Sequence, residues 1–252
     1  MKRTATSLVL LLFLFALPGG LAVAAPDPAG DLPVTGEATS PFEEAFGEEE
    51  APLKVWDPIE PVNRGIFWFN DKLYFYLLKP VARGLRVVPE PARVSVGNFF
   101  DNLAAPVRFA NKLLQFKLND ASDELARFVF NSTFGIAGLF DIAKEQGGVS
   151  RKEEDFGQTL GHYGTGAGFY LVLPLFGPSN PRDVVGRVGD YFLDPLPYAL
   201  NNWELIGARA VDKENDLSLD KDTYEGIKRD ELDPYLFIRD AYAQRRQAQI
   251  NK

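Results

Sequence analysis

The 252-residue sequence contains no cysteine, a single methionine and a single histidine. Without cysteine the chain can form no disulfide bond, has no thiol nucleophile and cannot hold a thiolate-bound metal. Because His162 is the only histidine, sites built from several histidines are excluded as well. We therefore expect no metal site and no cofactor site, and a fold stabilised by its core alone.

Motifs that carry catalysis are also missing. The sequence has no Gly-x-Ser-x-Gly elbow, and the glycine-rich segment 164–168 lacks both the Gly-x-Gly-x-x-Gly spacing and the lysine of a P-loop. We expect no catalytic residue and no enzyme activity, and we expect His162 to be a structural hydrogen-bonding residue. The alternative is a lipid hydrolase that uses His162.

No apolar run is long enough to cross a bilayer, which takes about 18 residues or more. The longest run covers residues 8–17; Lys2 and Arg3 precede it, and the small residues 22–24 follow it. This pattern predicts a signal peptide over residues 1–24, cleaved after Ala24, and therefore an exported protein. The alternative is an N-terminal membrane anchor.

Basic clusters are absent too, and the net charge of −8 is concentrated in one segment. Residues 27–50 hold eight acids and no base, which leaves the rest of the chain close to neutral. We expect residues 25–53 to be an acidic disordered linker, with a short helix over 42–50 as the alternative, and residues 54–252 to form the domain. A nucleic-acid groove is not supported.

Aromatic side chains, by contrast, are abundant. The chain has 20 phenylalanines, and six of the ten residues in 67–76 are aromatic. Apolar residues recur at helical spacing over 66–78, with Asn63 as the expected N-cap and Lys79-Pro80 as the expected end or kink. This helix is apolar on nearly all sides and about 20 Å long, which suits insertion into one leaflet. A helix buried in a globular core is the alternative.

The remaining pattern predicts a mainly α fold. Residues 170–176 predict a strand or a membrane-inserted loop, and Asn180 predicts the N-cap of a helix that begins at Pro181. Other expected helices cover two stretches within 91–116 parted at Ala105-Pro106, then 120–130 with Asp123 near its N-terminus, 136–145, 201–213 and 234–250.

Nine short motifs occur in an order that resembles the VacJ/MlaA family of outer-membrane phospholipid-transport lipoproteins. They are found at residues 57–64, 69–70, 79–84, 88–93, 97–103, 138–143, 156–164, 170–174 and 233–235. The chain departs from the family in one respect, because the family normally carries a lipidated cysteine and this sequence has none.

The resemblance implies a single ring-shaped helical domain inserted in the periplasmic leaflet of the outer membrane. A central amphipathic channel would remove mislocalised phospholipids from the outer leaflet and pass them to a soluble periplasmic carrier, which maintains the asymmetry of the membrane. The resemblance also implies a trimeric porin as a partner. The alternative is a structural porin-associated envelope protein without lipid transfer.

Two groups of residues are candidates for this function. Aromatic and polar side chains of the first helix, Phe67, Phe69, Asn70 and Leu73, are expected to line the lipid path. The family's segment that matches the dense glycines is thought to gate the channel, so Gly164, Gly166 and Gly168 are expected to form a hinge. The alternative for these glycines is a rigid turn.

Overall fold

The computed structural model describes residues 54–252, and these residues are mainly helical. The predicted signal peptide, the predicted linker and the alternative helix over 42–50 lie outside the described residues. The elements are α3 (Glu60–Leu73), the π-helix η1 (Tyr74–Leu78), α4 (Lys79–Leu85), α5 (Glu90–Leu103), α6 (Ala105–Leu114), α7 (Leu118–Thr133), α8 (Ile142–Glu145), α9 (Phe156–His162), β1 (Leu171–Leu173), β2 (Gly177–Ser179), α10 (Pro181–Leu193), α11 (Leu196–Ala199), α12 (Asn202–Leu219), α13 (Thr223–Asp230) and α14 (Pro234–Ile250).

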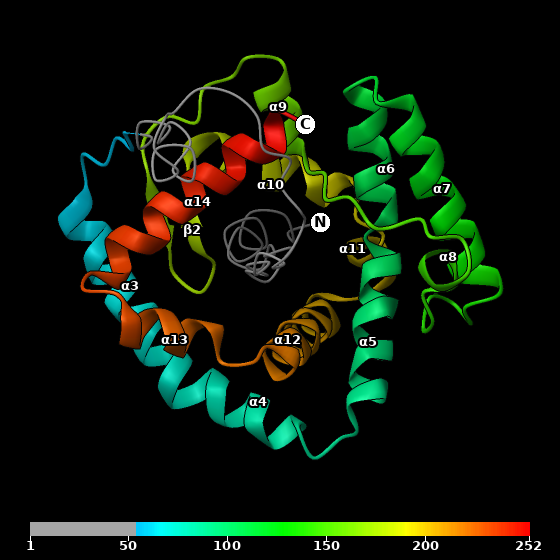
Figure 1. Cartoon of the computed structure of the whole chain (residues 1–252), viewed down its shortest axis with the longest axis horizontal. Helices are drawn as coiled ribbons and strands as arrows, with labels where there is room; N and C mark the ends of the chain where they lie inside the picture. Colours follow the sequence, from blue (N-terminus) through cyan, green and yellow to red (C-terminus); the bar gives the residue numbers. More distant parts are fainter. Residues whose placement is uncertain (1–53) are drawn as a thin grey trace, which may run out of the picture.

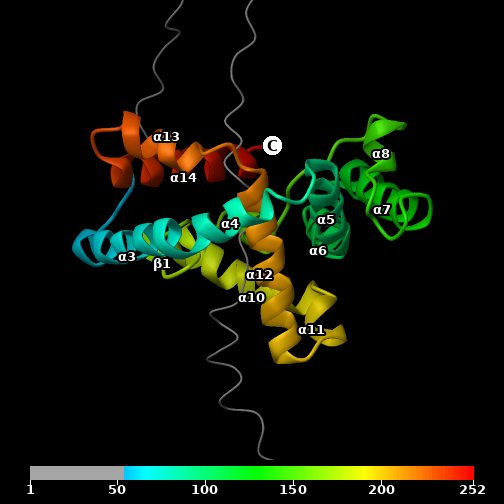
Figure 2. The same cartoon turned by 90° about the horizontal axis from the view of Figure 1, so that it is seen from below.

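The elements are arranged as a ring (Figure 1). Helices α3 and α4 form one arc, α5 to α7 form a second, and α9, α10 and α14 close the ring. Turned by 90°, the molecule has two different sides, with α13 and α14 on one and α11 with the start of α12 on the other (Figure 2). The predicted ring-shaped, mainly helical single domain is confirmed.

The first long helix differs from its prediction at its two ends. It begins at Glu60, with Ile59 as a cap that makes no side-chain hydrogen bond, so the assignment of Asn63 as N-cap is wrong. The chain also stays helical past Lys79-Pro80, through η1 into α4, so the predicted end at this pair is wrong and the alternative, a kink, stays a prediction. Proline lacks an amide N–H, and its ring crowds the preceding turn of a helix. The wider π-helical turn before Pro80 accommodates both the missing hydrogen bond and the bulk of the ring.

Asn63 instead joins α3 to the hairpin of β1 and β2. Its side chain is fully buried, donates to the Tyr170 carbonyl oxygen at 2.9 Å and accepts from the Val172 amide at 2.9 Å. The adjacent core consists of Tyr170, Val172 and Tyr235, packed against half-buried apolar side chains of α3 and α14. An amide side chain can replace the missing strand partner because it offers a donor and an acceptor together.

Polar caps confirm the starts of three later helices. The side chain of Asn180 accepts from the Asp183 amide at 2.8 Å and caps α10 as predicted. Asn201 and Glu204 form a capping box at α12, which extends beyond the predicted end to Leu219. The side chain of Asp233 accepts from the first amides of α14.

Two further corrections concern where helices begin. The helix predicted over 136–145 begins only at Ile142, because Ile136 and Ala137 have φ of 53° and 57° and cannot belong to a right-handed helix. Helix α7 begins at Leu118, so Asp120 lies in its first turn and Asp123 lies beyond it.

The segment 170–176 forms β1 and the turn of an antiparallel hairpin, and the predicted parting of α5 and α6 is confirmed. No helix among residues 54–252 is long and apolar enough to cross a membrane.

Candidate functional site

The distribution of polarity between interior and surface is reversed relative to an ordinary soluble domain. Among the described residues, 21 polar or charged side chains are buried, against ten hydrophobic ones. Four of those ten are alanines, so few bulky apolar side chains lie inside. Charged residues are rarely buried in soluble proteins unless they are paired. The interior is therefore held together largely by polar contacts.

Many large apolar side chains are instead exposed. Trp68, Tyr76 and Trp203 are 62%, 78% and 79% exposed. We call the exposed set on α3, η1, α7 and α10 to α12 the apolar perimeter; it comprises Val62, Trp68, Phe69, Phe75, Tyr76, Leu77, Leu118, Leu125, Val129, Phe130, Val185, Val188, Phe192, Tyr198, Trp203 and Val211. Exposed apolar residues are normal when scattered, but a surface this rich in them indicates contact with a membrane or another protein.

A buried ionic triad joins α6 to α7. Glu124 is fully buried and accepts from Arg108 Nε at 2.7 Å and from Lys112 Nζ at 2.6 Å. The two cations lie one helical turn apart on α6, so one carboxylate can bind both. Removal of the carboxylate would leave two buried cations without this counter-ion.

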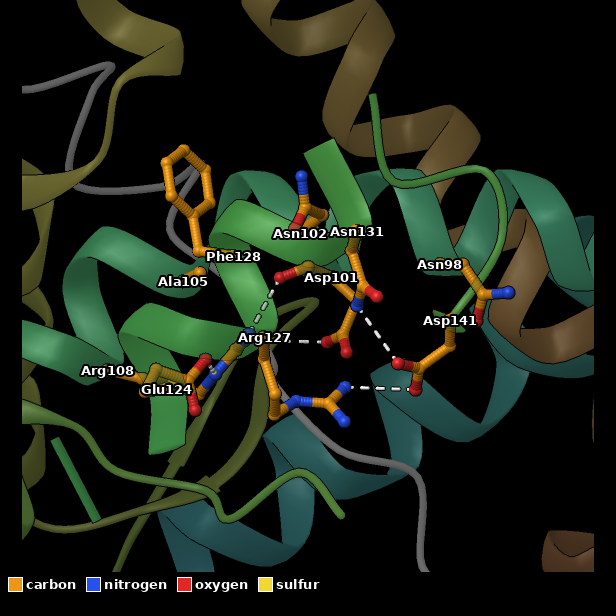
Figure 3. A pocket seen from close by; sticks show the side chains of 10 residues that line it. All are labelled: Asn98, Asp101, Asn102, Ala105, Arg108, Glu124, Arg127, Phe128, Asn131 and Asp141. Carbon is orange, nitrogen blue, oxygen red and sulfur yellow. Dashed lines mark hydrogen bonds and ion pairs between the residues drawn. The ribbon is translucent and has the colours of Figure 1, made fainter. Parts of the chain in front are cut away.

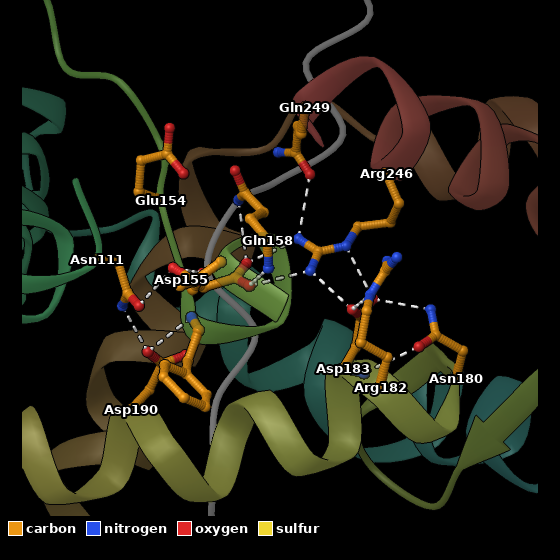
Figure 4. A network of polar contacts seen from close by, with 12 residues as sticks. Asn111, Glu154, Asp155, Gln158, Asn180, Arg182, Asp183, Asp190, Arg246 and Gln249 are labelled. Atoms are coloured by element: carbon orange, nitrogen blue, oxygen red, sulfur yellow. Dashed lines mark hydrogen bonds and ion pairs between the residues drawn. The ribbon is translucent and has the colours of Figure 1, made fainter. Parts of the chain in front are cut away.

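A second polar network joins α9, α10 and α14 (Figure 4). The guanidinium of Arg246 binds Asp155 Oδ2 at 2.7 Å through Nη1 and Asp183 Oδ1 at 2.9 Å through Nη2. Burial opposes ionisation of Asp155, yet the hydrogen bonds from Arg246 hold the pKa of this carboxyl below its usual value. This network fixes the C-terminal helix to the rest of the ring.

Asp190 belongs to the same network but forms no ion pair with a cation among residues 54–252. Its Oδ1 accepts from Asn111 Nδ2 at 2.8 Å and from the Phe156 amide at 3.0 Å. Burial, together with the negative charge of Asp155, raises the pKa of Asp190 to about 7. This carboxyl therefore changes its charge near neutral pH.

A small polar cavity lies between α5, α6, α7 and the turn before α8 (Figure 3). Arg127 Nη2 donates to Asp141 Oδ2 at 2.9 Å, and Asn131 Nδ2 donates to Asp141 Oδ1 at 2.9 Å. The cavity volume of about 10 Å³ is the size needed for one water molecule. It is too small for a lipid or a cofactor.

The four residues predicted to line a lipid path do not share one environment. Phe67 is half-buried, with its ring 5.7 Å from that of Tyr235, whereas Phe69 is exposed. Asn70 Nδ2 donates to the Leu173 carbonyl oxygen at 2.9 Å, and Asn70 Oδ1 accepts from the Leu175 amide at 2.8 Å. Leu73 is half-buried at the end of α3. Asn70 therefore fixes α3 to the hairpin turn, and a role for these residues in lipid passage stays a prediction.

The three glycines predicted as a hinge lie in the segment between α9 and β1. Gly164 and Gly168 have φ of +85° and +78°, which favour glycine, but Gly166 does not. A Cβ at Gly168 would lie 3.3 Å from Pro181, whereas one at Gly164 or Gly166 would meet open space. Two of the three positions thus need glycine for conformation, and their role as a hinge stays a prediction.

His162 lies exposed at the end of α9, where its ring meets that of Tyr163 edge to face at 5.3 Å between centroids. Its side chain makes no hydrogen bond within residues 54–252, so the predicted structural hydrogen bond is not found there. No group of three or more potential ligand side chains in this part of the chain could hold a metal ion.

Comparison with known proteins places these features in context. The model of the family described as MlaA lipoprotein matches residues 55–249. A solved structure described as the structural basis for maintenance of bacterial outer membrane lipid asymmetry is similar with a TM-score of 0.70 and 35% identity, over 77% of this chain and 98% of that one.

Curated relatives are similar over most of their length. The intermembrane phospholipid transport system lipoprotein MlaA of Escherichia coli is 36% identical over 75% of this chain and 76% of that protein. The protein of the same name from Haemophilus influenzae is 33% identical over 77% and 79%. An uncharacterized protein of Rickettsia felis is 36% identical over 80% and 81%.

Proposed function

Because the chain belongs to the MlaA lipoprotein family, we propose that it is a phospholipid-binding conduit of the bacterial outer membrane. It removes mislocalised phospholipids from the outer leaflet and passes them to a soluble periplasmic carrier. It acts by binding and passive transfer and not by catalysis. Residues 54–252 form the transport domain, after a signal peptide over 1–24 and an acidic linker over 25–53.

The reversed polarity of the described domain is the observation that carries this proposal. Apolar side chains on the outside suit hydrocarbon, and paired polar side chains inside suit a protein that holds its shape without a large hydrophobic core. Two acyl chains contain about 30 methylene groups at about 0.8 kcal/mol each, so their exposure to water costs on the order of 25 kcal/mol. A ring embedded in one leaflet gives these chains an apolar route.

The two sides of the ring support an orientation. Phe192, Tyr198 and Trp203 are 65%, 71% and 79% exposed, and they belong to the end of α10, to α11 and to the start of α12. Helix α11 and the start of α12 lie on one side of the ring (Figure 2). On the other side, α13 carries a largely polar sequence, and its Arg229 and Asp230 are exposed. We place the α10–α12 side deeper in the membrane and the α13–α14 side toward the periplasm.

Attachment to the membrane follows from the same surface. The sequence contains no cysteine that could be acylated, although the matching family is one of lipoproteins. A single acyl chain gives only marginal binding, so an extensive apolar perimeter is an adequate replacement. A trimeric porin and a periplasmic lipid carrier complete the proposed assembly.

A lipid transfer assay tests this function. The full-length protein in donor vesicles should pass labelled phospholipid to the periplasmic carrier, and lipid should co-purify with it and be detected by mass spectrometry. Phe192→Glu should reduce membrane association and transfer, whereas Gln244→Glu, a matched change at an exposed position of α14, should leave both unchanged. Wild-type protein that folds but neither retains nor transfers phospholipid would contradict the conduit and leave a structural envelope protein.

A further inference from the structure

A polar cleft lies where α4, α5 and α12 meet, away from the residues predicted to line the lipid path. Its cavity volume is about 280 Å³. We call it the α4–α12 cleft; its lining residues are Arg86, Glu90, Arg93, Ser218, Leu219, Asp220, Lys221 and Asp222. Helix α12 runs from the α11 side of the ring toward α13, so the cleft lies at its end on the polar side (Figure 2).

Two guanidinium groups converge in this cleft. Arg86 Nε donates to the Ser218 carbonyl oxygen at 3.2 Å, and Arg93 Nη1 donates to the same oxygen at 2.6 Å. Two positive charges that share one acceptor repel each other unless anions lie nearby. Arg86 has such a partner in Asp222 at 3.1 Å. Arg93 has no carboxylate within ion-pair distance among residues 54–252, so part of this positive charge is not neutralised.

Each of these arginines also keeps donors free. The hydrogen bonds of Arg86 use Nε and Nη2, and those of Arg93 use Nε and Nη1, which leaves one terminal nitrogen of each without a partner in the described chain. Paired guanidinium groups with free N–H donors match the geometry of a phosphate, whose oxygens accept several such bonds at once.

Two of the three acidic side chains of the cleft are already bound by other groups of the chain. Asp222 is bound by Lys79 and Arg86, and Asp220 accepts from Thr223 at the start of α13. Glu90 is exposed and makes no contact with a cation in the described residues. The lining thus has three basic and three acidic side chains, a balance that suits a zwitterion better than an anion.

We propose that the α4–α12 cleft binds the headgroup of a zwitterionic phospholipid that carries a primary amine, a specificity that rests on the function proposed above. Arg86 and Arg93 donate to the phosphodiester oxygens, and Glu90 accepts from the ammonium. Val87 and Val88, 88% and 43% exposed beside the cleft, contact the acyl chains. The cleft thereby selects the headgroup on the periplasmic side of the ring.

The test uses tail-free glycerophosphoethanolamine, which a hydrocarbon-lined path does not retain, titrated into the full-length protein in a non-ionic detergent. Saturation-transfer NMR should show binding that the double variant Arg86→Gln, Arg93→Gln weakens at least tenfold. Arg83→Gln is the matched control, because Arg83 lies one turn earlier on α4 and is exposed without a partner in the described residues. Equal binding by the double variant and the wild type would overturn the proposal.

A second variant keeps the test valid if the arginine variants do not fold. Glu90→Gln removes a charge from an exposed side chain, so the fold should be unaffected. It should weaken the binding of glycerophosphoethanolamine at least threefold and should not weaken the binding of inorganic phosphate, because a negative charge is removed. Unchanged affinity for glycerophosphoethanolamine in this variant would contradict a zwitterion site.

Inorganic phosphate and dihexanoyl phosphatidylethanolamine separate the two sources of a phosphate group. The short-chain lipid should bind at least tenfold more tightly than inorganic phosphate, because its tails lie on Val87 and Val88. Equal affinities would assign the cleft to free phosphate and overturn the lipid assignment. A failure of headgroup binding in the cleft is distinguishable from a failure of the proposed function. If the cleft does not bind the headgroup but the chain is a conduit, the wild-type protein still transfers lipid to the carrier.

Discussion

The substitution Asp190→Asn should change how the stability of the protein depends on pH. Folding raises the pKa of Asp190 from 3.8 to about 7, chiefly through burial and then through the charge of Asp155. The folded state therefore binds this proton more tightly than the unfolded state does. Its contribution to stability is fully present below the unfolded pKa and is lost as the pH rises to the folded pKa.

The size of the effect follows from the shift in pKa. At about 1.4 kcal/mol per unit, a shift of roughly three units corresponds to about 4 kcal/mol. Asparagine stays neutral at every pH, and its Oδ1 can accept from Asn111 Nδ2 and the Phe156 amide as Asp190 does. The variant should thus gain about 4 kcal/mol relative to the wild type between about pH 4 and about pH 8.

Chemical unfolding in detergent, followed by circular dichroism at several pH values, measures this difference. Burial also raises the pKa of Asp212, to about 6, but this group titrates in both proteins and leaves the difference unaffected. Asp120→Asn is the control, because the ion pair of Asp120 with Lys152 is exposed at the surface. Stability curves for Asp190→Asn and the wild type that run parallel from pH 4 to pH 8 would refute the reasoning.

Three further predictions use the same unfolding measurement. Glu124→Ala should destabilise the protein by about 3–5 kcal/mol, because it leaves Arg108 and Lys112 buried without their shared carboxylate. The control Asp120→Ala should destabilise it by less than about 1 kcal/mol. Equal effects of the two substitutions would contradict the buried triad. Asn70→Leu should cost about 1–3 kcal/mol, because Leu173 and Leu175 lose their hydrogen-bond partner in the hairpin turn, and a neutral result would show that this contact is dispensable. Gly168→Ala should destabilise the protein by more than about 1 kcal/mol, because Gly168 has a positive φ and an added Cβ would contact Pro181. Gly166→Ala should leave the free energy of unfolding nearly unchanged. Impaired lipid transfer by a folded Gly166→Ala protein would favour the hinge over the rigid turn.

Sequence patterns predicted those elements whose signals are local. Asn180 followed by Pro181 predicted the start of α10, and the period of apolar residues predicted α3, because caps and helical spacing act over a few neighbouring residues. The ring shape was predicted only by the resemblance to the family, because no local sequence signal encodes how distant helices pack against one another.

Other features depend on contacts between distant segments. Asn63 reads as an N-cap in the sequence, but it is buried by a hairpin 107 residues away, to which it binds. Helix α13 has few apolar residues, and the short helix α11 lies between prolines and asparagines, so neither gives a clear periodic pattern.

The sequence likewise predicted only part of the candidate site. The aromatic content of 67–76 indicated a membrane surface, yet the perimeter also includes residues of α7 and α10 to α12 that sequence reasoning did not single out. The α4–α12 cleft depends on Arg93 and Ser218, which are 125 residues apart. A pairing of this kind leaves no sequence signal, although Arg93 lies in the motif at residues 88–93.

Tryptophan fluorescence tests most directly whether the apolar perimeter faces hydrocarbon. Trp68 and Trp203 are 62% and 79% exposed, so each can report alone in a variant whose other tryptophans are replaced by phenylalanine. In vesicles of lipids brominated along the acyl chains, both should be strongly quenched, whereas a tryptophan introduced on α14 by Gln244→Trp should not. Quenching of Trp68 and Trp203 no stronger than that of the α14 control would contradict a ring embedded in the membrane.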